Sequence, residues 1–256
     1  MNQVTDQQII EILRKEAVPA LGCTEPVACA LACAKCKEVL GSVPERLDVL
    51  VSGNIYKNGM GVGIPGTGMV GLPIAAALGA VCGKSEYGLE VLKEVNVGDN
   101  LQRAKDMLGQ VTVSLKEDAP DKLYAEALAT KGNDTVKVII AHTHTNIVLV
   151  EKNGEEIFKR EFRLDTSKPE DKGPELSVKR IWDFVHEVDV KDIEFVLQGA
   201  EMNKAISAEG LNSEYGLQIG KTLKENIDKG LLEDDLLNRT LIRATAASDA
   251  RMDGCP

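Results

Sequence analysis

The chain has 256 residues, of which 43% are hydrophobic and 27% are charged, and its formal net charge is -10. These proportions are typical of a globular protein whose length suits one large domain or two modest ones. The negative charge argues against nucleic acid as a general partner, because phosphate binding requires a basic surface. No stretch reaches the roughly 18 to 20 consecutive apolar residues of a membrane span, and the N-terminus lacks the apolar core of a signal peptide. We therefore expect a cytoplasmic location without membrane contact.

Two helices are predicted near the N-terminus. Isoleucine and leucine recur near helical spacing after Thr5, which can cap a helix, so we expect a helix over residues 5–16. A second helix is expected over residues 24–40. Pro26 is tolerated in its first turn, and Gly41 is the kind of residue at which helices end.

A strand and a glycine-rich loop follow. RLDVLVSG, residues 46–53, alternates apolar and polar residues, which is typical of a half-buried strand. The next stretch opens as a glycine-rich loop and becomes a helix of small residues from about Met69 to Val81. Further helices are expected at about residues 85–95 and 99–108.

Residues 110–162 change character, because short β-type runs there are separated by turn signals such as Asn153-Gly154. This pattern predicts an antiparallel meander. A polar linker is expected over residues 166–175. The stretches after it have helical patterns: residues 176–187, 191–208, 214–229 and 233–248.

These elements predict an α+β fold, in which a mostly helical domain with small, buried Ala/Gly-rich helices carries an antiparallel β-meander insert. We expect an N-terminal helical part over 1–109, the meander over 110–165 and a C-terminal helical part over 174–256. At the end of the chain a helix-type pattern runs into Gly254-Cys255-Pro256, which looks like a cut through a loop. The C-terminal part is therefore expected to be truncated.

Six cysteines without an export signal indicate reduced thiols, not a disulfide framework. Cys29, Cys33 and Cys36 share one face of the predicted helix, so they are either three metal ligands or small apolar core residues. Their neighbours are apolar almost all round the helix, and no second Cys or His pair stands nearby at zinc spacing. Both observations favour the core.

Two other cysteines lie in predicted loops. Cys23 precedes a helix start, where the helix dipole and free N–H groups favour a thiolate, the form that binds iron or attacks carbon. A buried structural cysteine is the alternative. Cys255 stands between a glycine and a proline and is a candidate second ligand, whereas Cys82 ends an Ala-rich helix and is expected in the core.

Three glycines match the spacing G-x-G-x-x-G: Gly61, Gly63 and Gly66. A dinucleotide site requires this motif directly after a strand, and ten residues intervene here, so that reading is disfavoured. A glycine-rich turn that feeds a helix at Thr67-Gly68 suits a small carboxylate instead. Lys57 and Asn58 just upstream add a cation and an amide. The alternative is that the glycines only permit close packing.

Two further clusters carry chemistry-bearing side chains. His142 and His144 are predicted on one face of a β segment, as a metal clip, as ordinary polar groups of a sheet, or with one of them as a proton carrier. Near the C-terminus, a second cluster stands among alanines: Arg243, Ser248, Asp249 and Arg251. Two arginines among small residues suit a substrate carboxylate, and surface ion pairs are the alternative.

Four stretches together resemble the L-cysteine desulfidase family, which is related to the α domain of iron–sulfur L-serine dehydratases. They are PALGCTEPVACALA (19–32), SGNIYKNGMGVGIPGTGMVGLPIAAALGA (52–80), HTNIV (144–148) and AASDARMDGC (246–255). The resemblance runs in register from about residue 8 to the end of the chain. It implies a [4Fe–4S] lyase that converts L-cysteine to pyruvate, ammonia and sulfide, or L-serine to pyruvate and ammonia.

The resemblance also implies roles for particular residues. In such enzymes three cysteines hold the cluster, and an open iron acts as a Lewis acid on the β-leaving group while a base takes the α proton. By position, Cys23 and Cys255 are the implied cluster ligands. The base is not named by the sequence, and Lys57 and His144 are candidates for it on their chemistry and position alone. The implied substrate-binding residues are Asn54, Asn58, Gly66, Thr67, Gly68 and Arg251.

The chain departs from the family pattern at its C-terminal end. Family members continue past the GC motif to a further cluster cysteine, and Asp253 stands where a glycine is expected. We therefore expect an N-terminal fragment that is catalytically incompetent alone, with a small amino acid as its ligand. A binding module for small carboxylates is the alternative. The sequence leaves the oligomeric state open, with a homodimer as one candidate, and does not choose between cysteine and serine.

Overall fold

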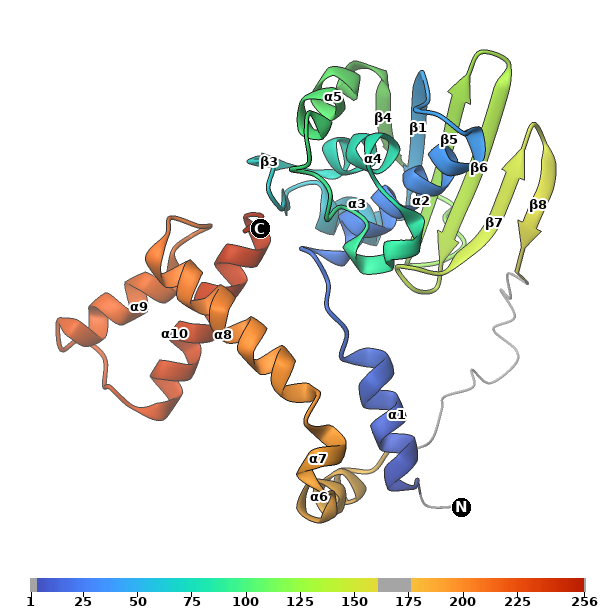
Figure 1. The fold of residues 1–256 in the computed structure, drawn as a ribbon. Coiled ribbons are helices and arrows are strands. Elements are labelled where there is room, and N and C mark those ends of the chain that lie inside the picture. Colours follow the sequence, from blue (N-terminus) through green and yellow to red (C-terminus); the bar gives the residue numbers. More distant parts are fainter. Residues whose placement is uncertain (1–3, 161–175, 256) are drawn as a thin grey trace.

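The computed structural model describes residues 4–160 and 176–255 (Figure 1). The predicted linker at 166–175 lies outside the described residues. The first part of the chain forms, in order, α1 (Asp6–Glu16), α2 (Thr24–Leu40), β1 (Arg46–Val51), α3 (Gly53–Gly59), β2 (Gly63–Ile64), β3 (Met69–Val70), α4 (Leu72–Val81), η1 (Ser85–Glu90), α5 (Asn100–Met107) and η2 (Leu108–Gln110).

The second part begins with strands and ends with helices. Its elements are β4 (Val111–Leu115), β5 (Tyr124–Lys131), β6 (Asp134–Ala141), β7 (Ile147–Lys152), β8 (Glu155–Lys159), α6 (Val178–Glu187), α7 (Val190–Ile193), α8 (Val196–Asn212), α9 (Ile219–Asp228) and α10 (Leu236–Met252). The fold is therefore α+β, as the sequence predicts. None of the helices within these ranges is long and apolar enough to cross a membrane.

Six strands form one mixed sheet in the order β4-β1-β5-β6-β7-β8. The predicted antiparallel meander is confirmed for β5 to β8. The run at 111–115 does not belong to it, because β4 pairs in parallel with β1, with Leu47 opposite Val111. A parallel neighbour requires a crossover connection, which the helices between β1 and β4 provide. Strand β1 therefore lies between β4 and β5, and the expected parts 1–109 and 110–165 share one sheet.

Helices α2 and α4 cover one face of this sheet (Figure 1). They cross so closely that a Cβ atom at Gly79 would overlap the Ala30 carbonyl oxygen. Many of the buried side chains in this core are small, and they include the three cysteines on one face of α2: Cys29, Cys33 and Cys36, all fully buried. The Cys36 thiol donates to the Ala127 carbonyl oxygen at 3.5 Å. The core interpretation of these three cysteines is thus confirmed.

The glycine-rich stretch folds differently from the prediction. Residues 53–59, predicted as loop, form α3, because Ile55 is buried and Gly59 packs directly on Leu72. The helix expected from Met69 begins only at Leu72, since 69–70 pairs with 63–64 as a two-stranded hairpin. Packing and pairing therefore outweigh local helical preference in this part of the chain.

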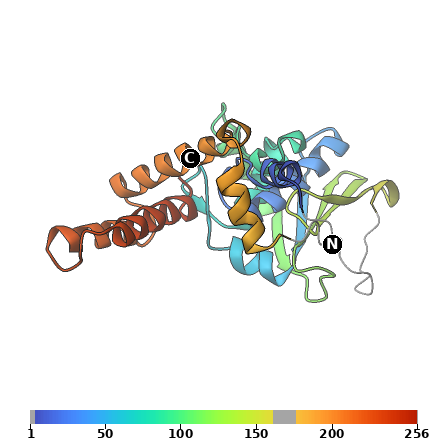
Figure 2. The same cartoon turned by 90° about the horizontal axis from the view of Figure 1, so that it is seen from below.

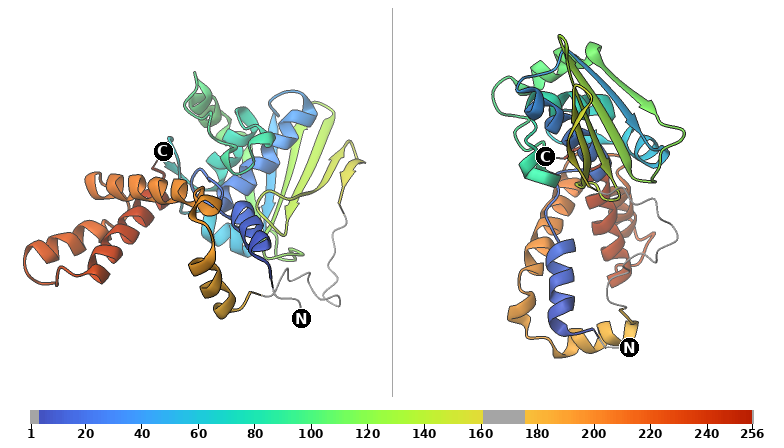
Figure 3. Two further views of the ribbon diagram at one scale, coloured as in Figure 1. Left: turned by 60° about the horizontal axis from the view of Figure 1, so that its bottom comes forward. Right: turned by 90° about the vertical axis from the view of Figure 1, so that its right-hand side faces the viewer.

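The C-terminal helices extend away from the sheet, as Figures 2 and 3 show. The predicted helix at 191–208 is divided into α7 and α8. Helix α6 packs on α1 through Phe184, which joins Ile9 and Ile10 in a small cluster. Arg180 on α6 is buried, donates to the Val4 carbonyl oxygen at 2.6 Å and pairs with Asp6. Helices α1 and α6 are thereby held together away from the main core.

Candidate functional site

The turn before α2 places Cys23 at the N-cap of that helix. A Cβ atom at the preceding Gly22 would lie 2.8 Å from Pro65 Cγ, so the turn packs directly on the β2–β3 hairpin. This contact links two of the stretches that carry the family resemblance, GCTEP and IPGTG. The glycine is therefore required by packing at a position beside the candidate ligand.

Glu25 connects three candidate residues. The Cys23 thiol donates to Glu25 Oε2 at 2.9 Å, and the Asn58 amide donates to Glu25 Oε1 at 3.1 Å. The carboxylate also interacts electrostatically with His144. Sequence reasoning missed Glu25, although it lies inside the GCTEP block, because a carboxylate in the first turn of a helix is also an ordinary partner of the helix dipole.

The surroundings of Cys23 keep its thiol protonated. Burial and the hydrogen bond to Glu25 raise the pKa of Cys23 to about 11, and the Arg251 charge lowers it only in part. This differs from the expectation of a thiolate, because desolvation and the neighbouring carboxylate outweigh the helix dipole. Burial acts to raise the pKa of Glu25, but the hydrogen bonds from Cys23 and Asn58 lower it overall. Glu25 is therefore a carboxylate at neutral pH.

The two histidines do not share a strand face. Strand β6 ends at Ala141, and His142 and His144 lie in the turn that leads to β7. His142 has a positive φ of 71°, and its Nδ1 lies 2.5 Å from Asp121 Oδ2. His144 instead lies near Glu25, and burial lowers the pKa of His144 while the Glu25 charge partly opposes that shift. The expected clip geometry is therefore wrong, and His144 is a half-buried imidazole that is neutral at pH 7.

The end of α10 reaches the same place from the other end of the chain. Arg251 Nη2 donates to the Gly22 carbonyl oxygen at 3.2 Å. A Cβ atom at Gly63 would overlap the backbone of Asp253, and one at Gly254 would lie 2.9 Å from the Gly63 carbonyl carbon. Cys23 and Cys255 thus each follow a turn that packs on residues 63–65.

Cys255 has a further neighbour in the loop between α8 and α9. A hydrogen bond between the Tyr215 hydroxyl and the Cys255 thiol raises the pKa of Tyr215. Both Cys23 and Cys255 are half-buried, whereas the other four cysteines are buried. The two candidate ligands therefore differ from the core cysteines in accessibility as well as in position. Cys82 is among the buried four, as expected.

The hairpin tip contains three of the predicted substrate-binding residues, Gly66, Thr67 and Gly68. Thr67 is buried, and its hydroxyl donates to the Ile64 carbonyl oxygen at 2.6 Å and accepts from the Met69 amide at 2.9 Å. Because α4 begins only at Leu72, the tip is not a helix N-terminus, and that expectation is corrected. The Thr67 side chain holds the hairpin in shape.

The remaining candidates lie on helix surfaces. Asn54, Lys57 and Asn58 share one exposed face of α3 by their spacing, and Asn58 reaches Glu25. On α10, Arg243 and Ser248 are exposed, and neither is among the residues that contact the hairpin. The remaining member of the C-terminal cluster is buried and holds the start of α9: Asp249 accepts from the backbone amides of Leu217 at 3.3 Å and Ile219 at 2.8 Å.

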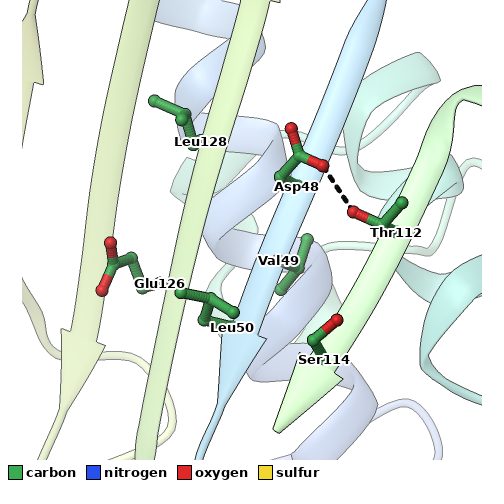
Figure 4. Close-up of a pocket in the computed structure, with 7 residues that line it drawn as sticks. All are labelled: Asp48, Val49, Leu50, Thr112, Ser114, Glu126 and Leu128. Atoms are coloured by element: carbon green, nitrogen blue, oxygen red, sulfur yellow. Dashed lines mark hydrogen bonds between the residues drawn. The ribbon is translucent and has the colours of Figure 1, made fainter. Parts of the chain in front are cut away.

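Two grooves lie on the open face of the sheet, away from this site. One, of about 220 Å³, runs across β4, β1 and β5, and its Asp48 carboxylate is hydrogen-bonded to Thr112 (Figure 4) and to Arg46. The other, of about 210 Å³, lies over β6 and β7 and is lined by residues such as Tyr124 and Leu149. Neither groove is lined by Cys23 or Cys255.

The metal-ligand chemistry of the candidate site is incomplete. No group of three or more His, Cys, Asp or Glu side chains within 4–160 and 176–255 is arranged to hold a metal ion. Around Cys23 the structure brings together the Glu25 carboxylate, a neutral imidazole and a guanidinium, and the turn that holds Cys255 packs on the same hairpin as the turn that holds Cys23. The lysine predicted as a base, Lys57, makes none of the hydrogen bonds or ion pairs found in the described part of the chain.

Several known proteins are similar to this chain along almost its whole length. A UPF0597 protein of Dichelobacter nodosus (strain VCS1703A) is 48% identical over 254 residues, which are 98% of this chain and 58% of that protein. One from Actinobacillus pleuropneumoniae serotype 3 is 47% identical over 251 residues, 97% of this chain and 58% of the relative. One from Parabacteroides distasonis is 44% identical over 260 residues, 99% of this chain and 60% of the relative.

The alignments therefore cover nearly all of this chain but only part of each relative. The chain spans 58% to 60% of the length of these relatives. No protein-family model matches the chain, and no solved structure does.

Proposed function

We propose that this chain, which is related to the UPF0597 proteins over nearly its whole length, is part of an iron–sulfur-dependent β-eliminating lyase. Its substrate is L-cysteine, which gives pyruvate, ammonia and sulfide, or L-serine, which gives pyruvate and ammonia. The chain contributes the N-terminal portion of such an enzyme, and a protein of the relatives' full length carries the activity.

One observation carries this proposal. Cys23 and Cys255 come from opposite ends of the chain, and the turns that hold them both pack on residues 63–65 of the glycine-rich hairpin. Arg251 ties the two turns together through the Gly22 carbonyl oxygen. These two half-buried thiols are not packed in the core as the four buried cysteines are. Their positions suit a ligand that needs both thiols.

The donor set fits part of a [4Fe–4S] cluster. Cysteine thiolates are the usual ligands of such clusters, and Cys23 and Cys255 are the thiols that would hold this one. The third ligand comes from outside the described residues, in keeping with the share of the relatives that this chain does not span. When bound, the cluster supplies an open iron that acts as a Lewis acid toward the β-leaving group.

The protein's own groups have roles around that position. His144 is neutral at pH 7 and half-buried, so its imidazole can take the α proton. Lys57 on α3 is the other candidate for this role. Arg251 uses one N–H on Gly22, which leaves guanidinium donors for the substrate carboxylate. Backbone N–H groups at Gly66 and Gly68, with the amides of Asn54 and Asn58, complete the proposed substrate contacts.

The test uses the full-length product of the open reading frame that encodes these residues. After anaerobic reconstitution with iron and sulfide, we expect absorbance near roughly 400 nm, typical of such clusters, and pyruvate formation from L-cysteine or L-serine. Cys23→Ala removes both signals, whereas Cys33→Ala, a matched change in the core of α2, leaves the cluster in place. Pyruvate formation by protein from which iron has been removed by a chelator would contradict the mechanism.

A second candidate is a binding module for small carboxylates without chemistry. It is favoured by the lack of a third metal ligand among the described residues. Titration calorimetry of the 256-residue chain with L-cysteine and L-serine separates the two. Binding to this chain, combined with no turnover by the full-length product, supports the binding module.

A further inference from the structure

Helices α8, α9 and α10 form a layer that is packed in an unusual way. Helix α10 contacts both α8 and α9. At these contacts a Cβ atom at Gly210 would overlap the Ala246 carbonyl oxygen, and one at Gly220 would lie 2.7 Å from the Ala246 Cβ atom. The three helices therefore meet through glycine and alanine, with very little side-chain volume between them.

Ile242 is the one large apolar side chain on the described helices α8, α9 and α10 that is buried, and many of the others are exposed. The most exposed are leucines, with exposed fractions of 82% for Leu217, 72% for Leu231, 83% for Leu236 and 66% for Leu237. Others on the same helices are exposed as well: Val196, Leu197, Met202, Ile219, Leu241 and Met252. Within the described residues, none of the three buried apolar clusters includes a residue of α8, α9 or α10.

Such a layer has the opposite arrangement to a helical unit that is stable in water. An amphipathic helix places its large apolar side chains against neighbouring elements and its polar ones outside. Single exposed leucines are common on protein surfaces, but a run of them along one layer indicates a surface that another polypeptide covers. Exposed leucines lie near both ends of α10. Leu231 and Leu236 are at its N-terminal end, and Leu217 is near its C-terminal end, where the Leu217 amide donates to Asp249.

The length of the relatives offers one candidate for the polypeptide that covers this surface. The chain spans 58% of the Dichelobacter nodosus relative, so 100 minus 58, or about 42%, of that protein has no counterpart here. We propose that the exposed face of α8, α9 and α10 is the docking surface for this unmatched part of the UPF0597 polypeptide. Because α10 leads directly to Arg251 and Cys255, a segment seated on the layer lies next to the candidate site.

A second copy of the chain is the competing occupant. Two copies related by a twofold axis meet through one self-complementary patch. The exposed leucines instead occupy both ends of α10 and the loops on either side of α9, and Figures 2 and 3 show this layer standing clear of the sheet. A surface of this extent suits a long segment that wraps around the helices.

Hydrogen exchange tests the proposal on intact proteins. We expect the α10 amides to exchange at least about tenfold more slowly in the full-length Dichelobacter nodosus protein than in the 256-residue chain, since covered helices open less often. The internal control is β7, which is central to the meander and should exchange alike in both proteins. Equal exchange of α10 in the two proteins overturns the proposal.

Co-expression supplies a second measurement with a matched control. The 256-residue chain is produced together with the tagged unmatched part of the Dichelobacter nodosus protein, and recovery of the chain on the tag is measured. We expect Leu236→Glu to reduce recovery at least tenfold. Val178→Glu makes the same kind of change at a site on α6 that is 85% exposed, and it leaves recovery unchanged.

Two outcomes overturn the proposal here. The first is equal recovery of the Leu236→Glu and Val178→Glu chains, or no recovery of the unaltered chain. The second is a dimer of the 256-residue chain in sedimentation that Leu236→Glu dissociates, which assigns the surface to a second copy.

Discussion

The sheet with α2 and α4 and the layer formed by α8, α9 and α10 use the same way of crossing helices, with opposite results. In each, a glycine lies directly on the backbone of the partner helix, Gly79 on Ala30 and Gly210 on Ala246. Around the first crossing, large side chains such as Leu31 and Leu78 are buried in the main core. Around the second, several large apolar side chains, such as Leu236 and Leu237, are exposed to solvent.

The difference shows what a close helix crossing does and does not provide. It brings backbones together, but most stabilisation comes from apolar area removed from water, at about 1.5–3 kcal/mol for each fully buried aliphatic side chain. The first region has this area, because the sheet is the third partner of both helices. The second region lacks such a partner among the residues that the structure describes, so its local stability should be much lower.

The largest contrast is expected in thiol reactivity. Burial raises the pKa of Cys29 to about 12 and that of Cys33 well above its usual range, and alkylation of either thiol requires α2 to leave the sheet. With a typical stability of at least about 5 kcal/mol, labelling by iodoacetamide should be more than about a thousandfold slower than at half-buried Cys23. Mass spectrometry of the labelled peptides in native buffer and in urea measures this.

The pH dependence of the Cys23 reaction follows from its pKa of about 11. The thiolate is the reactive form, so the alkylation rate should keep rising with pH up to about 11. A rate that levels off near pH 8 would show that Cys23 is not held by burial and by Glu25. Labelling of Cys29 at the same rate as Cys23 would contradict the buried position of α2.

The next effect concerns the helix crossing in the body of the protein. Gly79→Ala places a methyl group on the Ala30 carbonyl oxygen, and overpacking of this kind costs about 3 kcal/mol in the free energy of unfolding. The control is Gly199→Ala in the first turn of α8, where nothing lies within 4 Å of the new Cβ atom. There the substitution should stabilise the helix by about 0.5–1 kcal/mol. Urea denaturation followed by circular dichroism compares both variants with the unaltered chain.

Gly210→Ala tests whether the layer of α8, α9 and α10 unfolds separately from the body of the protein. The new methyl group overlaps the Ala246 carbonyl oxygen, so α8 and α10 should move apart. Because that layer adds little to the main core, we expect the free energy of unfolding of the body to change by less than about 0.5 kcal/mol. The amides of α8 and α10 should exchange about tenfold faster. A loss of global stability equal to that of Gly79→Ala would mean that the layer and the body unfold as one unit.

The same two regions show how far the sequence could predict the fold. The bounds of α2 were predictable, because Pro26 suits a first turn and Gly41 ends the helix in a left-handed conformation. The place of β4 was not, since its own residues do not say which strand it will join. Helix α3 was missed because GNIYKNG has the composition of a loop, and only the packing of Gly59 on Leu72 holds it as a helix.

Only part of the candidate site was predictable from the sequence. Cys23 and Cys255 came from the family resemblance, and no spacing rule relates two residues at opposite ends of a chain. Glu25 was missed because its partners, Asn58 and His144, come from other elements. The predicted thiolate at Cys23 neglected a carboxylate two residues away, whose hydrogen bond to the thiol depends on a side-chain orientation that the sequence does not give.

The smallest change in the free energy of unfolding is expected from an exposed leucine of α10, compared with a buried leucine of α4. Leu237→Gln on α10 removes an apolar side chain that is already in water, so the free energy of unfolding of this chain should change by less than about 0.5 kcal/mol. Leu78→Gln makes the same change inside α4, where it leaves a polar amide among apolar side chains and should cost several kcal/mol. Urea denaturation of the two variants gives the difference directly. A cost at Leu237 close to that at Leu78 would mean that Leu237 is covered in solution, by another part of this chain or by a second copy, and the two regions would then be built alike.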